Sequence, residues 1–433
     1  MRIAIIGTGI AGNAAAYLLS DTHSIAVYER ELRSGGHSHT LEIDHGSTRL
    51  AVDMGFIVCN ALNYPNFTAL LDRLGVATQP ADMGFSVSLD GGRFEWAGRE
   101  TRVLDGLFAQ RSNLVSPGHL RMLLEILRLQ KTAKADLAAD AFGTLTLEEW
   151  LTARGFSPRL RDRYIVPMGA AIWSMPTASM LGFPASTFFR FCENHRLLQW
   201  QRPIWRTVTG GSKVYVEALQ AGFRDRLRLG AAVNRIERSP SGVVVHDSLG
   251  HAERYDVVVI AAHSDQALAM LAEPTSAERA ILSAITYRPN IAYLHRDASL
   301  MPRRRAAWAS WNYLGRSKDG GHGDICLTYW MNALQRLDPA RNVFVTLNPP
   351  REPDPALTFA RWEVSHPQYD AGACAAQQRL PQIQGRNRTY FCGAWTGHGF
   401  HEDGLVSGMA VAEALGARIA WRDGEMPMVE AAE

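Results

Sequence analysis

The sequence predicts an α/β protein in which a domain built on a parallel sheet is interleaved along the chain with an α+β domain that carries a mixed sheet and helices. Three stretches, residues 3–6, 257–262 and 389–395, contain strands of continuous apolar sequence. Such strands are typical of parallel sheets that helices cover on both faces. Between the last two stretches, residues 287–295, 325–332 and 342–347 read as strands with alternating faces, which predicts a second sheet.

A glycine-rich turn, GTGIAG at residues 7–12, follows the first strand without a spacer. Gly7 permits a tight turn, Gly9 lets the backbone approach a pyrophosphate, and Gly12 lets the next helix pack close to the strand. Ile10 and Ala11 open that helix, whose N-terminal amides and positive dipole end favour phosphate. The turn therefore predicts a dinucleotide site.

A second strand, residues 24–28, ends on Glu29, which lies 22 positions after Gly7. A carboxylate at this position can accept both hydroxyls of an adenosine ribose, and its charge would repel a 2′-phosphate. The complete βαβ unit fits within about 30 residues, as this motif requires. The sequence thus predicts a Rossmann-type domain for an unphosphorylated dinucleotide.

The residues after Glu29 carry a resemblance to a known family. They read RELRSGGHSHT, from Arg30 to Thr40. This segment is similar to the E-x5-G-G-x3-T extension of the superfamily of flavin-containing amine oxidases, phytoene desaturases and protoporphyrinogen oxidases. The resemblance implies a glutathione-reductase-like Rossmann-type domain that binds FAD without a covalent bond. The cofactor residues that it implies in this segment are Arg30, Gly35, Gly36, His37 and Ser38.

A competing pattern overlaps the same segment. Residues 33–38, RSGGHS, also resemble a segment of berberine-bridge-type oxidases, in which the histidine bonds covalently to flavin. That family lacks a dinucleotide fingerprint immediately upstream, whereas the spacing from Glu29 fits the amine oxidase superfamily. We therefore expect non-covalent FAD.

Three later segments extend the resemblance. Asp53-Met54-Gly55 looks like the D-x-G element that lies beside the flavin in the superfamily, and the strand around Val233 is similar to one whose backbone lies against adenine. The C-terminal strand and helix resemble the superfamily's last cofactor segment, although only two residues separate Gly404 from Ser407. There the helix N-terminus faces the flavin edge. The cofactor residues implied in this last segment are Gly393, Ala394, Gly404, Leu405 and Ser407.

We expect the FAD-binding domain to comprise residues 1–60, 207–263 and 385–420, and the substrate domain residues 61–206 and 264–384. Residues 421–433 read as a mobile tail. Residues 104–129 predict an amphipathic helix, with membrane contact as the alternative to packing. A helix that begins at Ser157-Pro158 is expected to end before Pro167. The aromatic and arginine residues of 173–206 could form core, a substrate channel or a bilayer contact.

Composition excludes several classes of function. The 433 residues carry a net charge of +2 and no long basic run, so we expect no nucleic-acid partner. The five cysteines form no C-x-x-C pair, which argues against a metal site and a disulfide framework. The apolar N-terminus contains the glycine motif, so we do not expect it to be a signal peptide. No stretch offers the 18 uninterrupted apolar residues that would predict a membrane-spanning helix. We expect a cytoplasmic protein, with peripheral contact to the inner face of the membrane left open; the sequence predicts no oligomeric state.

Within the superfamily the chain looks like the bacterial FAD-binding group described alongside cyclopropane fatty acid synthases, on the segments GGHSHT and YWMNALQ. Many amine oxidases place a lysine near flavin N5, but no lysine lies between Lys213 and Lys318. We therefore expect hydride removal from an apolar, acyl-type substrate. A redox-neutral double-bond isomerase, an amine oxidase and a non-catalytic partner of a lipid-modifying enzyme remain alternatives.

Catalytic candidates follow from the expected position of the flavin ring, beside the last cofactor segment. His398, His401 and Glu402 lie between the last cofactor strand and its helix and are the acid–base candidates. Trp395 and Tyr329 are expected to form walls of the substrate site.

Overall fold

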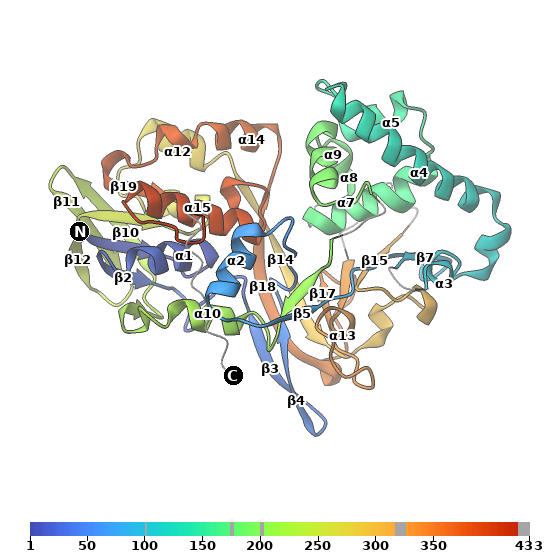
Figure 1. Cartoon of the computed structure of the whole chain (residues 1–433), viewed down its shortest axis with the longest axis horizontal. Helices are drawn as coiled ribbons and strands as arrows, with labels where there is room; N and C mark the ends of the chain where they lie inside the picture. Colours follow the sequence, from blue (N-terminus) through green and yellow to red (C-terminus); the bar gives the residue numbers. More distant parts are fainter. Residues whose placement is uncertain (100–101, 174–176, 200–202, 317–325, 423–433) are drawn as a thin grey trace.

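The computed structural model describes residues 1–99, 102–173, 177–199, 203–316 and 326–422. The chain forms two lobes, each with its own central sheet (Figure 1). The predicted tail of residues 421–433 lies outside the described residues except for its first two positions. None of the described helices combines the length and the apolar character that a membrane span requires.

The first lobe is built on a five-stranded sheet in which every pair of neighbours is parallel. Its spatial order is β19 (Thr389–Phe391), β13 (Val257–Ile260), β1 (Arg2–Ile6), β2 (Ser24–Tyr28) and β9 (Leu227–Arg228). All four residues of β13 are buried, as are the last four of β1 and β2, which confirms the predicted parallel strands. Strands from the start, middle and end of the chain therefore meet in one sheet.

Helices cover one face of this sheet, and a small second sheet covers the other. Helices α1 (Ile10–Leu19) and α15 (His401–Ala414) pack on the first face. On the opposite face lies an antiparallel sheet of β10 (Val233–Ser239), β11 (Gly242–Asp247) and β12 (Ala252–Tyr255). It is accompanied there by α11 (Ser264–Met270), α12 (Ser276–Leu282) and α14 (Ala371–Gln378).

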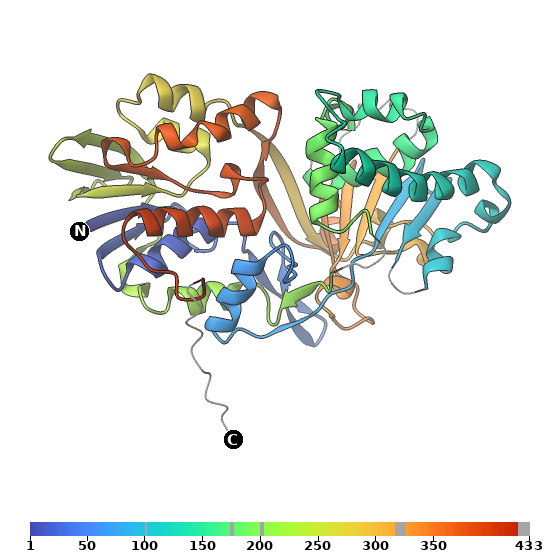
Figure 2. The same ribbon diagram turned by 45° about the horizontal axis from the view of Figure 1, so that its top comes forward.

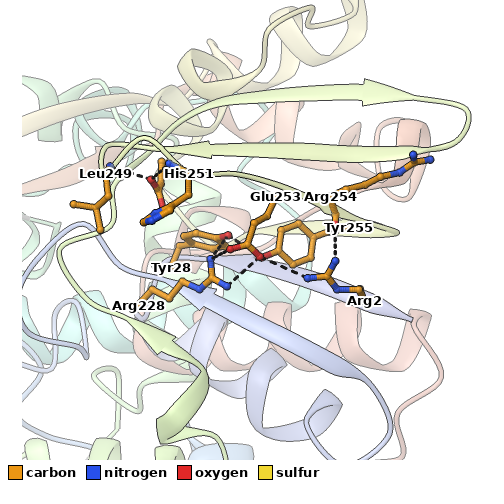
Figure 3. A network of polar contacts seen from close by, with 9 residues as sticks. Arg2, Tyr28, Arg228, Leu249, His251, Glu253, Arg254 and Tyr255 are labelled. Atoms are coloured by element: carbon orange, nitrogen blue, oxygen red, sulfur yellow. Dashed lines mark hydrogen bonds and ion pairs between the residues drawn. The ribbon is translucent and has the colours of Figure 1, made fainter.

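A polar network with two buried tyrosines at its centre joins these two sheets (Figure 3). The hydroxyl groups of Tyr28 on β2 and Tyr255 on β12 are 2.7 Å apart, and Arg228 on β9 donates to the Tyr28 hydroxyl at 2.9 Å. Glu253 pairs with Arg228 and accepts from Tyr255 at 3.0 Å. Arg2 on β1 adds a hydrogen bond to the carbonyl of Arg254. These contacts fix the small sheet against the edge of the parallel one.

The second lobe is built on a seven-stranded mixed sheet. Its order is β18 (Thr358–Gln368), β14 (Thr286–His295), β17 (Phe344–Leu347), β16 (Cys326–Trp330), β15 (Trp311–Gly315), β6 (Phe85–Leu89) and β7 (Phe94–Gly98). Three of these strands were expected from alternating sequence, and they confirm the predicted second sheet. Strand β18 was missed, although Ala360, Trp362 and Val364 alternate with Arg361, Glu363 and Ser365 in its sequence.

Helices cover one face of the seven-stranded sheet (Figure 2). The core between them contains Val87 and Trp96 from the sheet with Met122, Trp150 and Phe188 from the helices. The larger helices are α4 (Pro117–Ala138), α5 (Leu147–Ala153), α7 (Val166–Trp173) and α9 (Ala185–Asn194). The smaller ones are α3 (Val103–Leu107), α6 (Pro158–Leu160), α8 (Thr177–Leu181) and α13 (Met331–Leu334).

Further elements lie between the lobes. They are the hairpin of β3 (Thr40–His45) and β4 (Thr48–Asp53), the pair of β5 (Thr78–Pro80) and β8 (Arg206–Val208), and helices α2 (Pro65–Arg73) and α10 (Lys213–Gln220). The aromatic residues Phe183, Phe188, Phe189 and Phe191 are buried, so this part of the 173–206 stretch is core. The division into five domain segments stays a prediction.

Three helix boundaries differ from expectation. The helix predicted over residues 104–129 is divided into α3, a 3₁₀ turn at Arg111–Val115, and α4, which starts at Pro117 behind the Ser116 cap. The helix after Ser157 does not end before Pro167 but continues through a π-helical turn, Arg161–Ile165, into α7. The wider turn accommodates the proline, which lacks an amide donor. Helix α15 begins at His401 and not at Gly404, so His401 and Glu402 belong to its first turn.

Glycine contacts allow α1 and α15 to pack closely. A Cβ atom on Gly408 would lie 2.2 Å from the carbonyl oxygen of Ala11. We expect Gly408→Ala to lower the free energy of unfolding by about 1–3 kcal/mol through overpacking, although alanine favours a free helix by about 1 kcal/mol. Urea unfolding of the purified protein tests this. The control is Gly222→Ala, where a Cβ would meet nothing within 4 Å. Equal midpoints for Gly408→Ala and wild type would contradict the packing argument.

Candidate functional site

A single cavity of about 1770 Å³ extends through both lobes. In the first lobe it runs past the carboxyl ends of β1, β2 and β13, where open α/β sheets bind ligands. In the second lobe its walls come from the seven-stranded sheet and from α4, α7 and α9. Its volume exceeds the 300–1,000 Å³ range, roughly, of sites for one drug-sized molecule. It therefore has room for a dinucleotide and a second ligand.

In the first lobe, one wall of the cavity is formed by backbone atoms of glycine residues. Gly7 adopts a φ of +102°, and a Cβ there would lie 2.6 Å from the carbonyl oxygen of Ala261. A Cβ on Gly9 would project into open space, so the lack of a side chain there leaves the backbone open to a ligand. Gly36, at φ +57°, approaches the Cα of Gly9 so closely that a Cβ would be 3.0 Å from it. The two glycine segments thus meet at the start of α1.

Glu29 lies in the cavity wall at the end of β2. One carboxylate oxygen accepts the Thr8 amide at 3.0 Å and the Thr8 hydroxyl, and the other accepts the Glu31 amide at 2.9 Å. A carboxylate has about four acceptor positions, so capacity remains for a ribose hydroxyl. Glu29 also fixes the glycine turn, a role that its spacing in the sequence did not predict.

Three ring side chains lie around His37, and a fourth stacks on one of these three. Its ring centre is 5.5 Å from that of His366, 5.7 Å from Trp362 and 6.5 Å from His263, and Tyr287 stacks on His263 at 4.3 Å. Burial lowers the pKa of His37 and of His263 to about 4, and that of His366 to about 3. These imidazoles are neutral at pH 7. The Nε2 atom of His37 is buried and has no protein partner within the described residues, so it is available to a ligand.

Twelve of the nineteen predicted cofactor residues line the cavity. They are Gly7, Gly9, Ile10, Ala11, Glu29, Arg30, Gly36, His37, Gly55, Val233, Gly393 and Ala394. The structure brings together segments that are up to 387 positions apart, since Gly7 and Ala394 share one wall.

The other seven do not line the cavity. They are Gly12, Gly35, Ser38, Asp53, Gly404, Leu405 and Ser407. Gly12 and Gly404 permit close packing, because a Cβ would lie 2.0 Å from the Gly7 oxygen and 2.8 Å from the Ile10 side chain respectively. Ser407 accepts the Gly393 amide at 2.9 Å and holds the strand end in place. For these seven positions, direct contact with the cofactor stays a prediction.

Asp53 lies behind the wall and is almost fully buried. Its carboxylate accepts the amide and hydroxyl of Ser212, the hydroxyl of Thr40, and the side-chain amide of Gln335 at 3.1 Å. Burial raises the pKa of Asp53. The residue joins the hairpin, the start of α10 and the second lobe, whereas Gly55 two positions later lines the cavity itself.

Four of the five catalytic candidates line the cavity: Tyr329, Trp395, His398 and His401. The Trp395 indole donates to the carbonyl of Ala262 at 3.0 Å, and Tyr329 packs edge-on against Trp311. His401 stacks on Phe56 at 3.8 Å, and its Nε2 lies 2.7 Å from the Tyr215 hydroxyl. Burial lowers the pKa of His401 to about 3, so its ring is neutral at pH 7.

The fifth candidate, Glu402, is placed elsewhere. Its carboxylate points away from the cavity and accepts the amides of Asn66 and Phe67, at 2.9 and 3.0 Å, at the start of α2. Burial raises its pKa. Glu402 therefore caps a neighbouring helix, and we remove it from the acid–base candidates. Its side chain turns outward because α15 starts three residues earlier than expected.

The sequence-based prediction missed several cavity residues. They include Arg33, His195, His263, Trp362, His366 and Tyr369. His263 could have been found, because it follows the carboxyl end of an apolar parallel strand. Trp362 and His366 lie on β18, which was not predicted as a strand although its sequence alternates. Arg33 donates to the Gly36 carbonyl at 2.9 Å and lies over the Trp362 ring, so it brings a positive charge to the glycine segments.

The residues present fit FAD. The open backbone at Gly9, the N-terminus of α1 and the guanidinium of Arg33 suit a diphosphate, and Glu29 suits an adenosine ribose. The buried, unpartnered Nε2 of His37 offers a further polar contact. Within the described residues no group of three or more His, Cys, Asp or Glu side chains could hold a metal.

Because Glu402 caps α2, we expect a substitution there to change the stability of the protein. We expect Glu402→Gln to lower the free energy of unfolding by about 1–2 kcal/mol, because the neutral amide is a poorer cap for the amides of α2. FAD content and the rate of flavin reduction should not change. Urea unfolding and anaerobic stopped-flow absorbance measure the two effects. Loss of flavin reduction at unchanged stability would return Glu402 to the catalytic candidates.

Comparisons with known proteins agree with this geometry. The family model described as flavin containing amine oxidoreductase matches residues 10–416. AofH of Mycobacterium tuberculosis, which is named as a flavin-containing monoamine oxidase, is 27% identical over 268 residues. That match covers 59% of this chain and 56% of AofH, so the chain aligns with little more than half the length of this relative.

Solved structures share the fold over nearly the whole chain. Putrescine oxidase bound to putrescine has a TM-score of 0.68 at 16% identity, and the match covers 96% of this chain and 100% of that one. A fatty acid isomerase from P. acnes that produces CLA has a TM-score of 0.63 at 18% identity and covers 95% and 98%. Cyclohexylamine oxidase from Brevibacterium oxydans has a TM-score of 0.63 at 18% identity and covers 96% and 99%. From the family match, the chain belongs to the flavin-containing amine oxidoreductase family.

Proposed function

We propose that this enzyme removes hydride from a C–H bond of an apolar acyl chain of a fatty acid or lipid. The observation that carries the proposal is the lining of the second-lobe part of the cavity, which comes from residues 83–205 and 292–347 and is here called the substrate part. Bound FAD supplies the two-electron acceptor for the hydride. The chain itself must hold an apolar carbon, exclude water and take up a proton.

The substrate part is lined almost entirely by apolar and aromatic side chains. From α4 come Leu120, Leu123, Leu124, Ile126 and Leu127, and from α7 come Met168, Ala171, Ile172 and Trp173. Each CH₂ group transferred from water to such a surface contributes about 0.8 kcal/mol. An acyl chain thus gains affinity along its whole length, without a polar anchor at every carbon.

A protonated amine would find poor partners there. Among the described residues that line the substrate part, none is Asp, Glu or Lys, and Arg99 is the one residue with a permanent charge. A buried ammonium group requires a paired anion or a dense set of acceptors. The lysine expected near flavin N5 in many amine oxidases is also missing from the described residues of the whole cavity. These features favour an acyl chain over an amine, although the relatives include amine oxidases.

Histidines are the groups best placed to receive the proton. His195 lies in the cavity wall, and its ring centre is 5.5 Å from that of Phe400, the residue before α15. Its Nδ1 is 3.0 Å from the carbonyl oxygen of Phe191 and must be the donor, which leaves Nε2 as an acceptor in the neutral ring. Burial lowers the pKa of His195 to about 4, so this acceptor form dominates at pH 7. Burial also keeps the His401 ring neutral at pH 7, and its Nε2 lies beside the Tyr215 hydroxyl.

An isomerase is the second candidate. The fold shared with the fatty acid isomerase supports it, because a double-bond shift needs the same apolar cavity and the same hydride acceptor. The two reactions differ in the fate of the hydride, which returns to the substrate during isomerisation. Product mass therefore separates them.

Anaerobic mixing with substrate tests the proposal. Unsaturated phospholipid or free fatty acid should bleach the flavin absorbance in a single turnover, with a product lighter by two hydrogen atoms. A product of unchanged mass would identify an isomerase. Bleaching by putrescine or cyclohexylamine alone would identify an amine oxidase, and no reaction with any of these compounds would favour a non-catalytic partner of a lipid-modifying enzyme.

A charge placed in the substrate part gives a second test. We expect Ile172→Asp to slow flavin reduction by acyl substrates by about 100-fold or more, because desolvating a carboxylate beside the chain costs several kcal/mol. Ile172→Leu, which keeps the volume, is the matched control and should stay within about threefold of wild type. Equal rates for both variants would show that the acyl chain does not occupy this wall.

We further propose that FAD is bound without a covalent bond. Acid precipitation of the purified protein should leave the flavin absorbance in the supernatant. Removing FAD should lower the melting temperature, since a ligand at 1,000 times its Kd stabilises the folded state by about 4 kcal/mol. Flavin absorbance in the protein pellet would instead support a bond to His37, as the RSGGHS pattern allows.

A further inference from the structure

Apolar side chains are concentrated on one part of the surface. The structure describes thirteen large apolar side chains as exposed, and seven of them fall within 25 consecutive residues. We call this group the α3–α4 surface; it consists of Val103, Leu104, Leu114, Val115, Leu120, Leu124 and Leu127. Leu104, Leu124 and Val115 are 70%, 68% and 81% exposed. Contiguous exposed apolar surface of this kind marks an interaction site.

The α3–α4 surface is one continuous structural unit. A hydrogen bond of 3.0 Å between the His119 ring and the carbonyl of Leu107 ties the end of α3 to the start of α4, and α4 follows the 3₁₀ turn Arg111–Val115 directly. The unit lies at the end of the molecule opposite the parallel sheet (Figures 1 and 2).

The surface is also the opening of the cavity. Four of its members, Val103, Leu120, Leu124 and Leu127, are both exposed to solvent and part of the cavity wall. An apolar path therefore leads from the surface of α4 into the substrate part.

Positive charge surrounds this apolar surface. Residues 102–134 contain six Lys or Arg and two Asp or Glu, a net charge of +4, whereas the whole chain carries +2. Glu125, one of the two acids, is buried and paired with Arg121. At 100° per residue, Lys131 and Lys134 share an arc of about 80° with Leu120, Leu124 and Leu127. They are two of only four lysines in the chain.

We infer that the α3–α4 surface docks on an anionic phospholipid bilayer, from which an acyl chain enters the cavity directly. Exposed leucines beside lysines on one helix face are typical of helices that lie in the membrane interface, and each Lys or Arg near an anionic surface strengthens binding about fivefold. A second copy of this chain is a poorer partner, because a symmetric contact would bring the same cations face to face. The substrate role of the lipid rests on the proposed function; docking itself does not.

Sedimentation with vesicles tests the docking. The full-length FAD-loaded protein should sediment with phosphatidylcholine vesicles that contain phosphatidylglycerol, and salt should weaken this binding. Leu104→Gln/Leu114→Gln/Val115→Gln, none of which lines the cavity, should weaken binding by about tenfold or more. Lys131→Glu/Lys134→Glu should weaken it by about thirtyfold or more on anionic vesicles. Leu249→Gln, at a residue 62% exposed on the first lobe, is the matched control and should bind as wild type does.

The outcomes separate docking from catalysis. If docking is right and the proposed function is wrong, the protein binds vesicles but lipid never bleaches its flavin. If the function is right and docking is wrong, dissolved fatty acid bleaches the flavin while wild type stays in the supernatant with anionic vesicles. Equal binding by the triple variant and Leu249→Gln would also overturn the inference. So would light scattering that shows a dimer in wild type and a monomer in the triple variant, because the surface would then be an interface between copies.

Discussion

The buried carboxylate of Asp53 is the interaction on which the rest of the site depends. It gathers hydrogen bonds from Thr40, Ser212 and Gln335, which belong to the hairpin, the start of α10 and the second lobe respectively. A buried carboxylate is tolerated only when its acceptor positions are filled, so each of these donors is required where it is found. The hairpin of β3 and β4, the start of α10 and the second lobe are thereby fixed relative to one another.

Much of the cofactor half could be predicted from the sequence, because its features are local. Strand, glycine turn, helix and Glu29 follow each other within 29 residues, and each residue type has a steric or electrostatic reason for its position. The helix boundaries were harder to predict from the sequence. The π-helical turn before Pro167 and the early start of α15 depend on packing against neighbours, which sequence periodicity does not report. The direction of the Glu402 side chain follows from that early start, and so the residue was assigned to catalysis although it caps α2.

Prediction of the substrate half from the sequence failed for a different reason. Strand β18 was missed although Ala360, Trp362 and Val364 alternate with Arg361, Glu363 and Ser365, and it contributes Trp362 and His366 to the cavity. Such alternation indicates a strand, but it does not show that the strand borders a ligand site. Charge in the resulting cavity is concentrated in its cofactor part, at residues such as Glu29 and Arg33, whereas the substrate part presents mainly hydrocarbon. A wall of this kind suits a chain of methylene groups, as the proposed function requires, and the lining from α4 has the same apolar character.

The split of the parallel sheet along the chain has a consequence for synthesis on the ribosome. Strand β1 ends at Ile6, but β13 and β19, which complete its sheet, emerge only after residues 260 and 391. At 5–20 residues per second, the first strand waits roughly 20 to 80 s for its last partners. During that time β1 has its neighbour β2 but not β13, so its buried residues Ile3 to Ile6 lack part of their native cover. Gly393 and Ala394 line the cavity, so the nascent chain completes the cofactor site only after these residues have been made.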